Sequence, residues 1–232
     1  RVVLDQKRSK VSKATKRFER VAFPRVLDVV HEALTLCDWD SDRSEISSLL
    51  EFFVCDVKDA FFIMPNHPKE RRYFTFTYGG YFYVALRSTQ GSRVAPLTWS
   101  RTAALISRLT QSVTGPKRSR ISTYGDDPIL AMVGNMEERN RTVAIVICLW
   151  SALKLPLSLA KADRGFNLTW TSAAFTAKGK SAVTVAIKPA ILSDTLADIN
   201  SIVGTNVLSI KKLRSVTGKA AHIASLITFL RP

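Results

Sequence analysis

The chain has 232 residues, of which 46% are hydrophobic, so it can bury a sizeable core and is not expected to be disordered. No apolar run reaches membrane-spanning length, the longest being residues 142–153, and the basic first 25 residues contain no signal-peptide pattern. These features predict an intracellular protein, in the cytoplasm or the nucleus, without a membrane partner.

The formal net charge of +15 indicates a partner with many negative charges. Nucleic acid is the commonest such partner, although acidic lipids and acidic proteins share this property. Residues 1–25 carry nine Lys and Arg against two acids, whereas residues 28–59 carry nine acids against two bases. The acidic stretch is either a solvated helix and loop or a set of carboxylates gathered to hold cations. Three scattered cysteines without metal-ligand spacing predict free thiols in a reducing compartment.

The first half of the chain predicts a helix, a buried strand and a hairpin. Residues 1–5 have the pattern of a strand already under way, so we expect the chain to be cut from something longer. Apolar positions within 21–36 recur with a helical period, and residues 52–56 form a short apolar run that ends in an acid, typical of a buried strand. Aromatic segments within 73–84 flank a two-glycine turn, which predicts a β-hairpin.

The second half predicts further helices and strands. Pro96 is expected to open a helix that ends at the Gly115-Pro116 break. Residues 121–133 predict two strands joined by a turn, and residues 137–153 predict a helix that is apolar on most sides and therefore buried. Three further segments are expected: short strands at 168–170 and 182–187, and an amphipathic helix at 210–227. The order predicts a mixed α+β fold with helices on one side of a sheet.

The predicted catalytic chemistry depends on two groups of carboxylates. Asp56 stands at the end of the apolar strand, and the adjacent Asp126 and Asp127 stand at the tip of the second hairpin. A pair of aspartates in a turn is often ordinary turn chemistry. Carboxylates that gather in one place, however, repel each other and call for a cation, and two divalent ions about 3.5–4 Å apart would satisfy them. Because the ligands are hard oxygens, Mg²⁺ is expected, with Mn²⁺ as an alternative.

The ordered pattern resembles the reverse transcriptase family of the retroelement, or retrotransposon, type over nearly the whole chain. DVKDAF at 56–61 resembles the first palm motif, Gln90-Gly91 followed by Pro96 resembles the second, and YGDD at 124–127 resembles the catalytic hairpin. Lys161 stands where the family has a lysine beside the triphosphate. Two end segments also match: RVVLD at 1–5 resembles the fingers strand whose arginine lies over the phosphates, and LRSVTGK at 213–219 resembles the segment after the palm.

The resemblance implies an α+β right-hand polymerase whose palm is an antiparallel sheet backed by helices. It divides the chain into partial fingers at 1–50, a palm at 51–187 with a fingers-side hairpin at 71–95, and a thumb-like or connection-like segment at 188–232. The implied activity is RNA-directed DNA polymerisation with two metal ions. The implied partners are an RNA or DNA template with its primer and deoxynucleoside triphosphates, while the oligomeric state stays open.

The resemblance also implies a role for individual residues. Asp56, Asp126 and Asp127 would be catalytic and would hold the metal ions, with the Val57 carbonyl as a backbone ligand. Nucleotide binding is assigned to Arg1, Lys58, Asp59, Ala60, Phe61, Gln90, Gly91 and Lys161. Primer and template binding is assigned to Tyr124, Trp170, Lys211, Lys212 and Lys219.

Several of these roles have plainer alternatives. The amides of residues 58–60 would cup the triphosphate at a helix N-terminus, with Asp59 in a structural role there, capping or hydrogen-bonding. Gly91 would let the backbone approach the nucleotide. Phe61 would crowd the sugar 2′-carbon and exclude ribonucleotides, or it is an ordinary core phenylalanine. Lys161 would protonate the leaving pyrophosphate, or it is a surface lysine. Trp170 is a primer contact or a buried tryptophan, and the lysines at 211–219 meet a duplex or are merely solvated.

Three departures from the family pattern bear on whether this chain is catalytically active. The fingers strand before residue 1 and its lysine are missing, Thr171-Ser172-Ala173 stand where the family has a glycine, and Pro128 follows the aspartate pair. No ribonuclease H carboxylate set and no His/Cys zinc site is found in the sequence. One rival is an RNA-dependent RNA polymerase, against which Phe61 argues. The other rival is a catalytically inactive retroelement remnant that binds nucleic acid.

Overall fold

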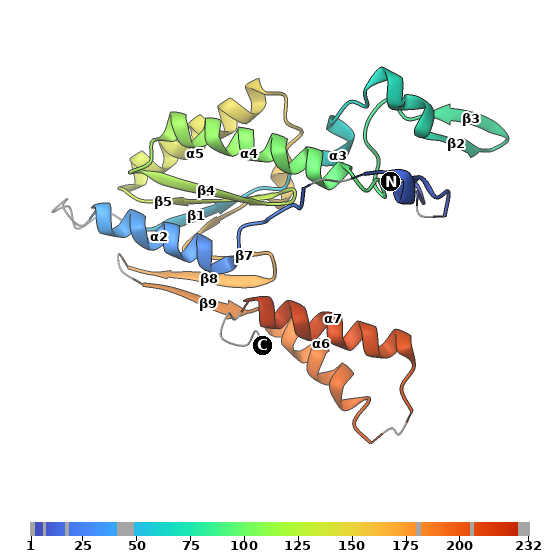
Figure 1. The fold of residues 1–232 in the computed structure, drawn as a ribbon. Helices are drawn as coiled ribbons and strands as arrows, with labels where there is room; N and C mark the ends of the chain where they lie inside the picture. The colour runs from blue at the N-terminus through green and yellow to red at the C-terminus, as the bar shows by residue number, and fades with distance from the viewer. Residues whose placement is uncertain are drawn as a thin grey trace.

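The computed structural model describes residues 3–6, 8–16, 19–40, 49–179, 182–204 and 207–226. Arg1, which was expected to bind the nucleotide, lies outside these residues. The fold combines helices with antiparallel sheets (Figure 1). Within the described residues, no helix is both long and apolar enough to pass through a membrane.

The central sheet has four strands in the order β4-β5-β1-β6, and every neighbouring pair is antiparallel. Its strands are β1 (Glu51–Val54), β4 (Ser119–Tyr124), β5 (Asp127–Met132) and β6 (Asp163–Gly165). The predicted buried strand at 52–56 and the predicted strand pair at 121–133 are therefore confirmed. Strand β6 was not predicted, because its three residues, Asp-Arg-Gly, carry no apolar pattern.

Both faces of the central sheet are covered, since successive side chains of a strand point to opposite faces. Phe52 is buried against α2 (Val26–Asp40), in a cluster that includes Ala33 and Leu36. Phe53 is buried on the other face, in a cluster with Val146 and Trp150 of α5. The expectation of helices on one side of the sheet is wrong: α2 covers one face, and α4 and α5 cover the other (Figure 1).

The long helices mostly lie where the sequence predicts them. Helix α4 (Ala95–Thr114) ends at Gly115 as expected. Helix α5 (Met136–Ala152) is capped by Asn135 and Glu138, but it buries only one face, so the prediction that it is buried on most sides is wrong. Helix α2 begins at Val26 rather than at residue 21, because the residue before Pro24 is disfavoured in helical conformation.

A second, three-stranded antiparallel sheet packs on the α2 side (Figure 1). Its strands are β7 (Asn167–Trp170), β8 (Ala173–Lys178) and β9 (Ala182–Ile187), of which β7 and β9 were predicted. Strand β8 was not, because its mainly small and polar residues have little β-strand preference. Thr171 and Ser172 form the β7–β8 turn with φ of +44° and +75°, so two non-glycine residues adopt the left-handed conformation where the family has a glycine nearby.

The remaining elements lie outside the two sheets. The predicted hairpin is confirmed as β2 (Thr75–Tyr78) and β3 (Tyr81–Val84), a sheet of its own that projects from the body (Figure 1). Short helices α1 (Val11–Ala14), α3 (Ala60–Ile63) and η1 (Pro68–Tyr73) connect the longer elements. The C-terminal helices are α6 (Pro189–Asn200) and α7 (Ile210–Leu226), of which only α7 was predicted. Asp198 of α6 forms ion pairs with Lys212 and Lys219 of α7.

Candidate active site

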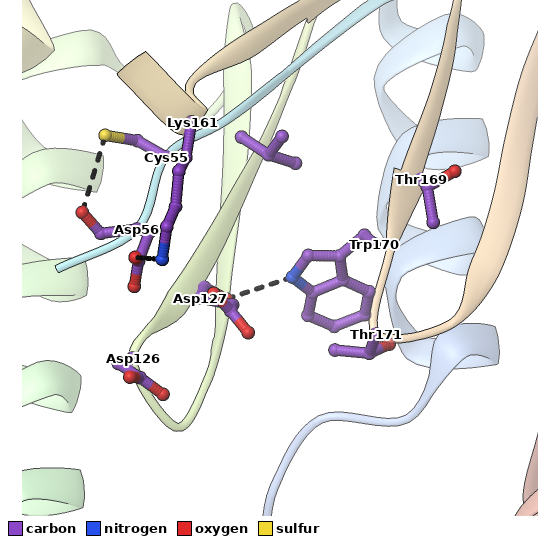
Figure 2. A pocket seen from close by; sticks show the side chains of 9 residues that line it. Cys55, Asp56, Asp126, Asp127, Lys161, Thr169, Trp170 and Thr171 are labelled. Atoms are coloured by element: carbon purple, nitrogen blue, oxygen red, sulfur yellow. Dashed lines mark hydrogen bonds and ion pairs between the residues drawn. The ribbon is translucent and has the colours of Figure 1, made fainter. Parts of the chain in front are cut away.

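The sheet topology brings the three aspartates around one cavity. Because β1 and β5 are antiparallel neighbours, the end of β1 lies beside the start of β5, with Val54 opposite Ile129. Past this pair, the Val57 N–H donates to the Asp126 carbonyl at 3.0 Å. Asp56, Asp126 and Asp127 therefore line one cavity of about 370 Å³ (Figure 2). The structure thus brings residues 70 positions apart in the chain to one cavity, whereas the prediction that they share metal ions stays a prediction.

The two hairpin aspartates occupy different backbone positions. Tyr124 pairs with Asp127, so the two-residue turn consists of Gly125 and Asp126, and Gly125 has a φ of +62° that suits glycine. Asp127 is the first residue of β5 and not a turn residue. Figure 2 shows Asp126 at the tip of the hairpin and Asp127 on the side that faces Trp170. The carboxylates of these two consecutive residues thus reach the cavity from different positions on the hairpin, one from its tip and one from its first strand residue.

Three consecutive carbonyls of the hairpin tip are each held by a different element. The Trp99 indole of α4 donates to the Gly125 carbonyl at 2.7 Å, and the Val57 amide holds the Asp126 carbonyl. The Trp170 indole of β7 donates to the Asp127 carbonyl at 2.9 Å. Trp99 is a buried residue of α4 that was not predicted to contribute to the site. The need of a buried indole N–H for an acceptor is a signal that could have linked it to the hairpin.

Trp170 is buried, with 2% of its surface exposed, and its ring packs edge-on against Tyr124 and Phe175. This position corresponds to the plainer of the two alternatives for Trp170, a core tryptophan. A side chain this deeply buried lacks the exposed surface that a primer contact requires. Its connection to the site is the hydrogen bond to Asp127.

Lys161 places its ammonium group on Asp56, 105 residues away in the chain. The distance from Lys161 Nζ to Asp56 Oδ2 is 2.6 Å (Figure 2). Backbone pairing sets this contact up: the Lys58 amide donates to the Pro156 carbonyl, and the Ser158 amide donates to the Asp56 carbonyl. The chain then forms the short helix η2 (Leu159–Lys161), which ends at the lysine. Lys161 is thus a lysine of the site, although 64% of its side chain is exposed.

The charges around the cavity interact. The pKa of the Asp127 carboxyl is raised to about 6, chiefly because packing around the group removes water from it, even though part of the residue remains accessible. The negative charges of Asp126 and then Asp56 raise the pKa further, while Lys161 lowers it. At neutral pH a positive charge in this cavity would therefore be stabilised.

The chemistry of these ligands suits a hard divalent cation. Among the described residues, three carboxylates and one ammonium group, that of Lys161, line the cavity. Nevertheless, within the described part of the chain no three Asp, Glu, His or Cys side chains lie close enough together to hold a metal ion as they stand. The carboxylates would have to turn toward one another, and Asp56 would have to leave Lys161. Val57, the expected backbone ligand, is buried directly after Asp56.

The residues expected to bind the triphosphate show a mixed outcome. The Lys58 amide already donates to the Pro156 carbonyl at 2.7 Å, so it does not point freely toward an anion. Asp59 precedes α3 with a φ of +53°, and of its two expected structural roles the side-chain cap of that helix is not observed. Ala60 is buried beside Trp99, and Phe61 is partly buried against the same cluster.

Gln90 and Gly91 contact the N-terminal segment. The Leu4 amide donates to the Gln90 carbonyl at 3.0 Å. Gly91 has a φ of +95°, and a Cβ atom there would lie 2.1 Å from the Leu4 carbonyl oxygen. The structure therefore shows a close backbone approach of Leu4 at this glycine, and the expected contact with a nucleotide stays a prediction.

The residues expected to bind primer and template are dispersed. Tyr124 is 43% exposed and packs on Phe23, with 4.6 Å between the ring centroids. Lys212 and Lys219 form ion pairs with Asp198, whereas Lys211 is exposed on α7. Of these residues, only Tyr124 and Trp170 lie near the aspartates.

Comparison with known proteins shows the fold. No protein-family model matches the chain, and no curated protein matches it in sequence. Among solved structures, it is similar to the foamy viral protease-reverse transcriptase dRH in complex with double-stranded DNA, with a TM-score of 0.64 and 17% identity over 97% of this chain. It is also similar to the foamy viral protease-reverse transcriptase with an RNA/DNA hybrid (TM-score 0.56, 19% identity, 78% of this chain) and with double-stranded DNA (0.58, 16%, 91%).

The chain spans 33%, 23% and 37% of the length of these three structures, respectively. At such identities the likeness concerns the fold alone. The chain has a reverse-transcriptase-like fold.

Proposed function

We propose that this chain, whose fold is reverse-transcriptase-like, is the core of an RNA-directed DNA polymerase from a retroelement. The observation that carries the proposal is the meeting of Asp56 with Asp126 and Asp127 around one cavity. In the family that the sequence resembles, these are the positions of the catalytic carboxylates. The likeness in fold supports the proposal, and the motif order assigns these roles to the three residues.

In the proposed site, Asp56, Asp126, Asp127 and the Val57 carbonyl would hold two Mg²⁺ ions. Bound there, such ions would activate the primer 3′-hydroxyl and stabilise the leaving pyrophosphate. The hydrogen bonds to the carbonyls of residues 125–127 hold the hairpin tip rigid, so that Asp126 and Asp127 are kept beside Asp56. Lys161, which pairs with Asp56 in the structure, would be free to contact a triphosphate if Asp56 held a metal ion instead.

The division into partial fingers at 1–50, a palm at 51–187 and a thumb-like segment at 188–232 is part of the proposal. It is supported by the central sheet at the aspartates, by the projecting β2–β3 hairpin and by the separate α6–α7 pair (Figure 1). The proposed partners are an RNA or DNA template with primer and deoxynucleoside triphosphates. The net charge of +15 suits a polyanion, and the similar solved structures are complexes with double-stranded DNA or an RNA/DNA hybrid.

The proposal is tested by extension of a DNA primer on an RNA template in the presence of Mg²⁺ or Mn²⁺. Extension that requires the metal and is lost in Asp126→Asn supports it. The matched control is Glu137→Gln, because Glu137 is an exposed acid in the first turn of α5, outside the cavity. Absence of extension by the unchanged chain, or equal extension by Asp126→Asn, contradicts the proposal.

A second candidate is an inactive remnant that binds nucleic acid. Two observations favour it: Lys161 occupies Asp56, and the carboxylates do not form a ready metal group among the described residues. Under this alternative the chain binds primer-template as tightly as an active polymerase would, but it extends no primer with either metal. The same assay therefore separates the two candidates.

A further inference from the structure

Outside the aspartate cavity, the β2–β3 hairpin exposes an unusual amount of aromatic surface. Tyr78 and Phe82 are 77% and 86% exposed, and Tyr73, Tyr81 and Val84 are also largely in solvent. Such rings are normally buried in a protein core, and a contiguous exposed patch of them marks an interaction site. An isolated two-stranded hairpin is also only marginally stable in water, so a bound partner would stabilise it.

The strand register gathers rings on one face. Phe76 pairs with Tyr83, and Tyr78 pairs with Tyr81, so these four aromatic side chains point to the same face of the hairpin. The Phe76 and Tyr83 rings are stacked, with 5.4 Å between centroids and 18° between planes. Neighbouring pairs on one face of a strand are about 6.8 Å apart along it. Phe82 presents a further ring on the opposite face.

The hairpin is held firmly at its base, although its tip is exposed. The side-chain amide of buried Asn66 donates to the Ala85 carbonyl at 3.0 Å and to the Arg87 carbonyl at 2.9 Å. The Asn66 backbone amide donates to the Leu86 carbonyl, and the Ser88 amide donates to the Met64 carbonyl. These bonds fix the strand ends, so the rings are presented from a defined place on the molecule.

The charge around the hairpin is mainly positive in sequence. Residues 71–125 contain nine Lys and Arg and no Asp or Glu, although the exposed Glu70 stands directly before them. Arg71, Arg72 and Arg87 flank the two strands. The Arg72 guanidinium lies over the Tyr73 ring, 4.9 Å from its centroid, and donates to the Tyr73 hydroxyl. Exposed rings combined with an excess of arginines suit a ligand with flat apolar groups on a negatively charged backbone.

We infer that the β2–β3 hairpin is a binding platform for single-stranded nucleic acid. Unpaired bases stack on Tyr78 and Tyr81, which share one face of the hairpin, and the phosphates lie toward the arginines at the hairpin base. A second copy of the chain is a poorer occupant, because two chains of charge +15 repel each other. A duplex is also a poorer occupant, since its bases are already stacked. The role of this surface as a template contact rests on the proposed function, whereas the binding itself needs neither metal nor catalysis.

The experiment measures binding by fluorescence anisotropy in EDTA. The probes are a labelled oligothymidylate of about 16 nucleotides, the upper end of typical single-strand site sizes, and a blunt duplex of the same length. The test variant combines Tyr78→Ser with Tyr81→Ser. The matched control combines Val203→Ser with Val207→Ser, because these side chains are equally exposed but lie beyond α6. All four changed side chains are in solvent, so the fold should be kept, and unfolding midpoints in urea verify this.

The expected result is a loss of single-strand affinity of about tenfold for each lost stacking contact, so about 100-fold in the test variant. Its duplex affinity and both affinities of the control should stay within about twofold of the unchanged chain. An oligonucleotide carrying 5-iodouracil should crosslink to Tyr78 or Tyr81 in the unchanged chain, which is a direct readout of proximity.

Three outcomes would overturn the inference. The first is unchanged single-strand affinity in the test variant, and the second is an equal loss for single strand and duplex, which indicates a general effect of charge or fold. The third is a change from dimer to monomer in sedimentation with unchanged oligonucleotide affinity, which identifies the hairpin as a self-association surface. Because the assay contains no metal, a failure of primer extension leaves its result intact, and the two proposals can fail separately.

Discussion

The indole Nε1 of Trp170 donates a hydrogen bond to the main-chain carbonyl of Asp127 at 2.9 Å, which joins β7 of the second sheet to β5 of the central sheet. With the Trp99 bond to Gly125, it fixes the hairpin tip that carries two of the three site aspartates. Strand β7, which was predicted as a short strand at 168–170, thus supports the hairpin that carries these aspartates.

Replacement of Trp170 by Phe should loosen the hairpin tip while keeping most of the packing against Tyr124 and Phe175. Because the Asp127 carbonyl would lose its donor, the expected loss in unfolding free energy is about 1–3 kcal/mol. Mn²⁺ affinity should also fall, since Asp127 is held less well. Urea unfolding and electron paramagnetic resonance of Mn²⁺ measure the two effects.

The control for this change is Trp150→Phe. The Trp150 indole donates to Thr110 in a buried hydrogen bond away from the aspartates. Its removal should cost similar stability without affecting metal affinity. If both variants reduce metal affinity equally, the effect comes from general loosening and the specific role of Trp170 is wrong.

Replacement of Lys161 by Met should raise the affinity of the nucleotide-free chain for Mn²⁺, because the metal would no longer compete with the ammonium group for Asp56. The lysine is well exposed, so the ion pair is weak, and the expected gain is about two- to fivefold. Isothermal titration calorimetry measures this affinity. Lys154→Met removes an exposed lysine elsewhere and should change nothing. An unchanged or lowered affinity in Lys161→Met would show that the lysine does not compete with the metal.

The raised pKa of Asp127, about 6 against an ordinary value of 3.8, predicts how stability depends on pH. The folded chain binds this proton more tightly than the unfolded chain, so the contribution of Asp127 is most favourable below pH 3.8 and is lost as the pH rises through about 6. Asp127→Asn should remove this loss. In metal-free buffer, its urea midpoint should exceed that of the unchanged chain above pH 6, and the difference should shrink toward pH 4.

The same pKa predicts that Mn²⁺ affinity declines as the pH falls below about 6, since a protonated carboxyl is a poor metal ligand. In Asp127→Asn the decline over this pH range should be shallower. A pH profile of metal affinity that is identical in the two proteins would show that Asp127 does not take part.

Replacement of Gly91 by Ala should detach the N-terminal segment. The new Cβ would lie 2.1 Å from the Leu4 carbonyl oxygen, and the φ of +95° is itself strained for alanine. The expected loss in unfolding free energy is about 1–3 kcal/mol. Gly179→Ala is the control, because Gly179 has a φ of +65° but open space around it, so only the backbone strain applies. Limited proteolysis should release the N-terminal segment faster in Gly91→Ala, and equal rates in both variants would contradict the steric argument.

Replacement of Phe61 by Ala should let an active chain incorporate ribonucleotides, because the family resemblance places this ring against the sugar 2′-carbon. Phe62→Ala is the matched control, since Phe62 is also partly buried on α3. Primer extension with ribonucleotides alone measures the effect. No gain in Phe61→Ala would leave the ring as a core residue, in keeping with its packing near Trp99.

The sequence by itself determined the elements whose signals are local. The two-glycine turn at Gly79-Gly80, the helix from Ala95 to Gly115 and the β4–β5 hairpin follow from turn chemistry and from apolar period, which neighbouring residues specify among themselves. The three aspartates were found for a related reason, because their motifs are short and stand in a recognisable order. Helix α6 could also have been predicted, since Pro189 and a helical spacing of apolar residues stand in the sequence.

Only the tertiary structure decided which distant groups meet. Lys161 pairs with Asp56 across 105 positions, Gly91 meets Leu4, and two tryptophans from different elements hold the carbonyls of Gly125 and Asp127. Such contacts depend on how strands pair and how helices pack, and no local pattern specifies these. For the same reason, aromatic side chains in similar short strands differ in burial: Trp170 of β7 is buried, whereas the tyrosines of β2 and β3 are exposed. Strand β7 packs against a layer of other core residues, and β2 and β3 do not.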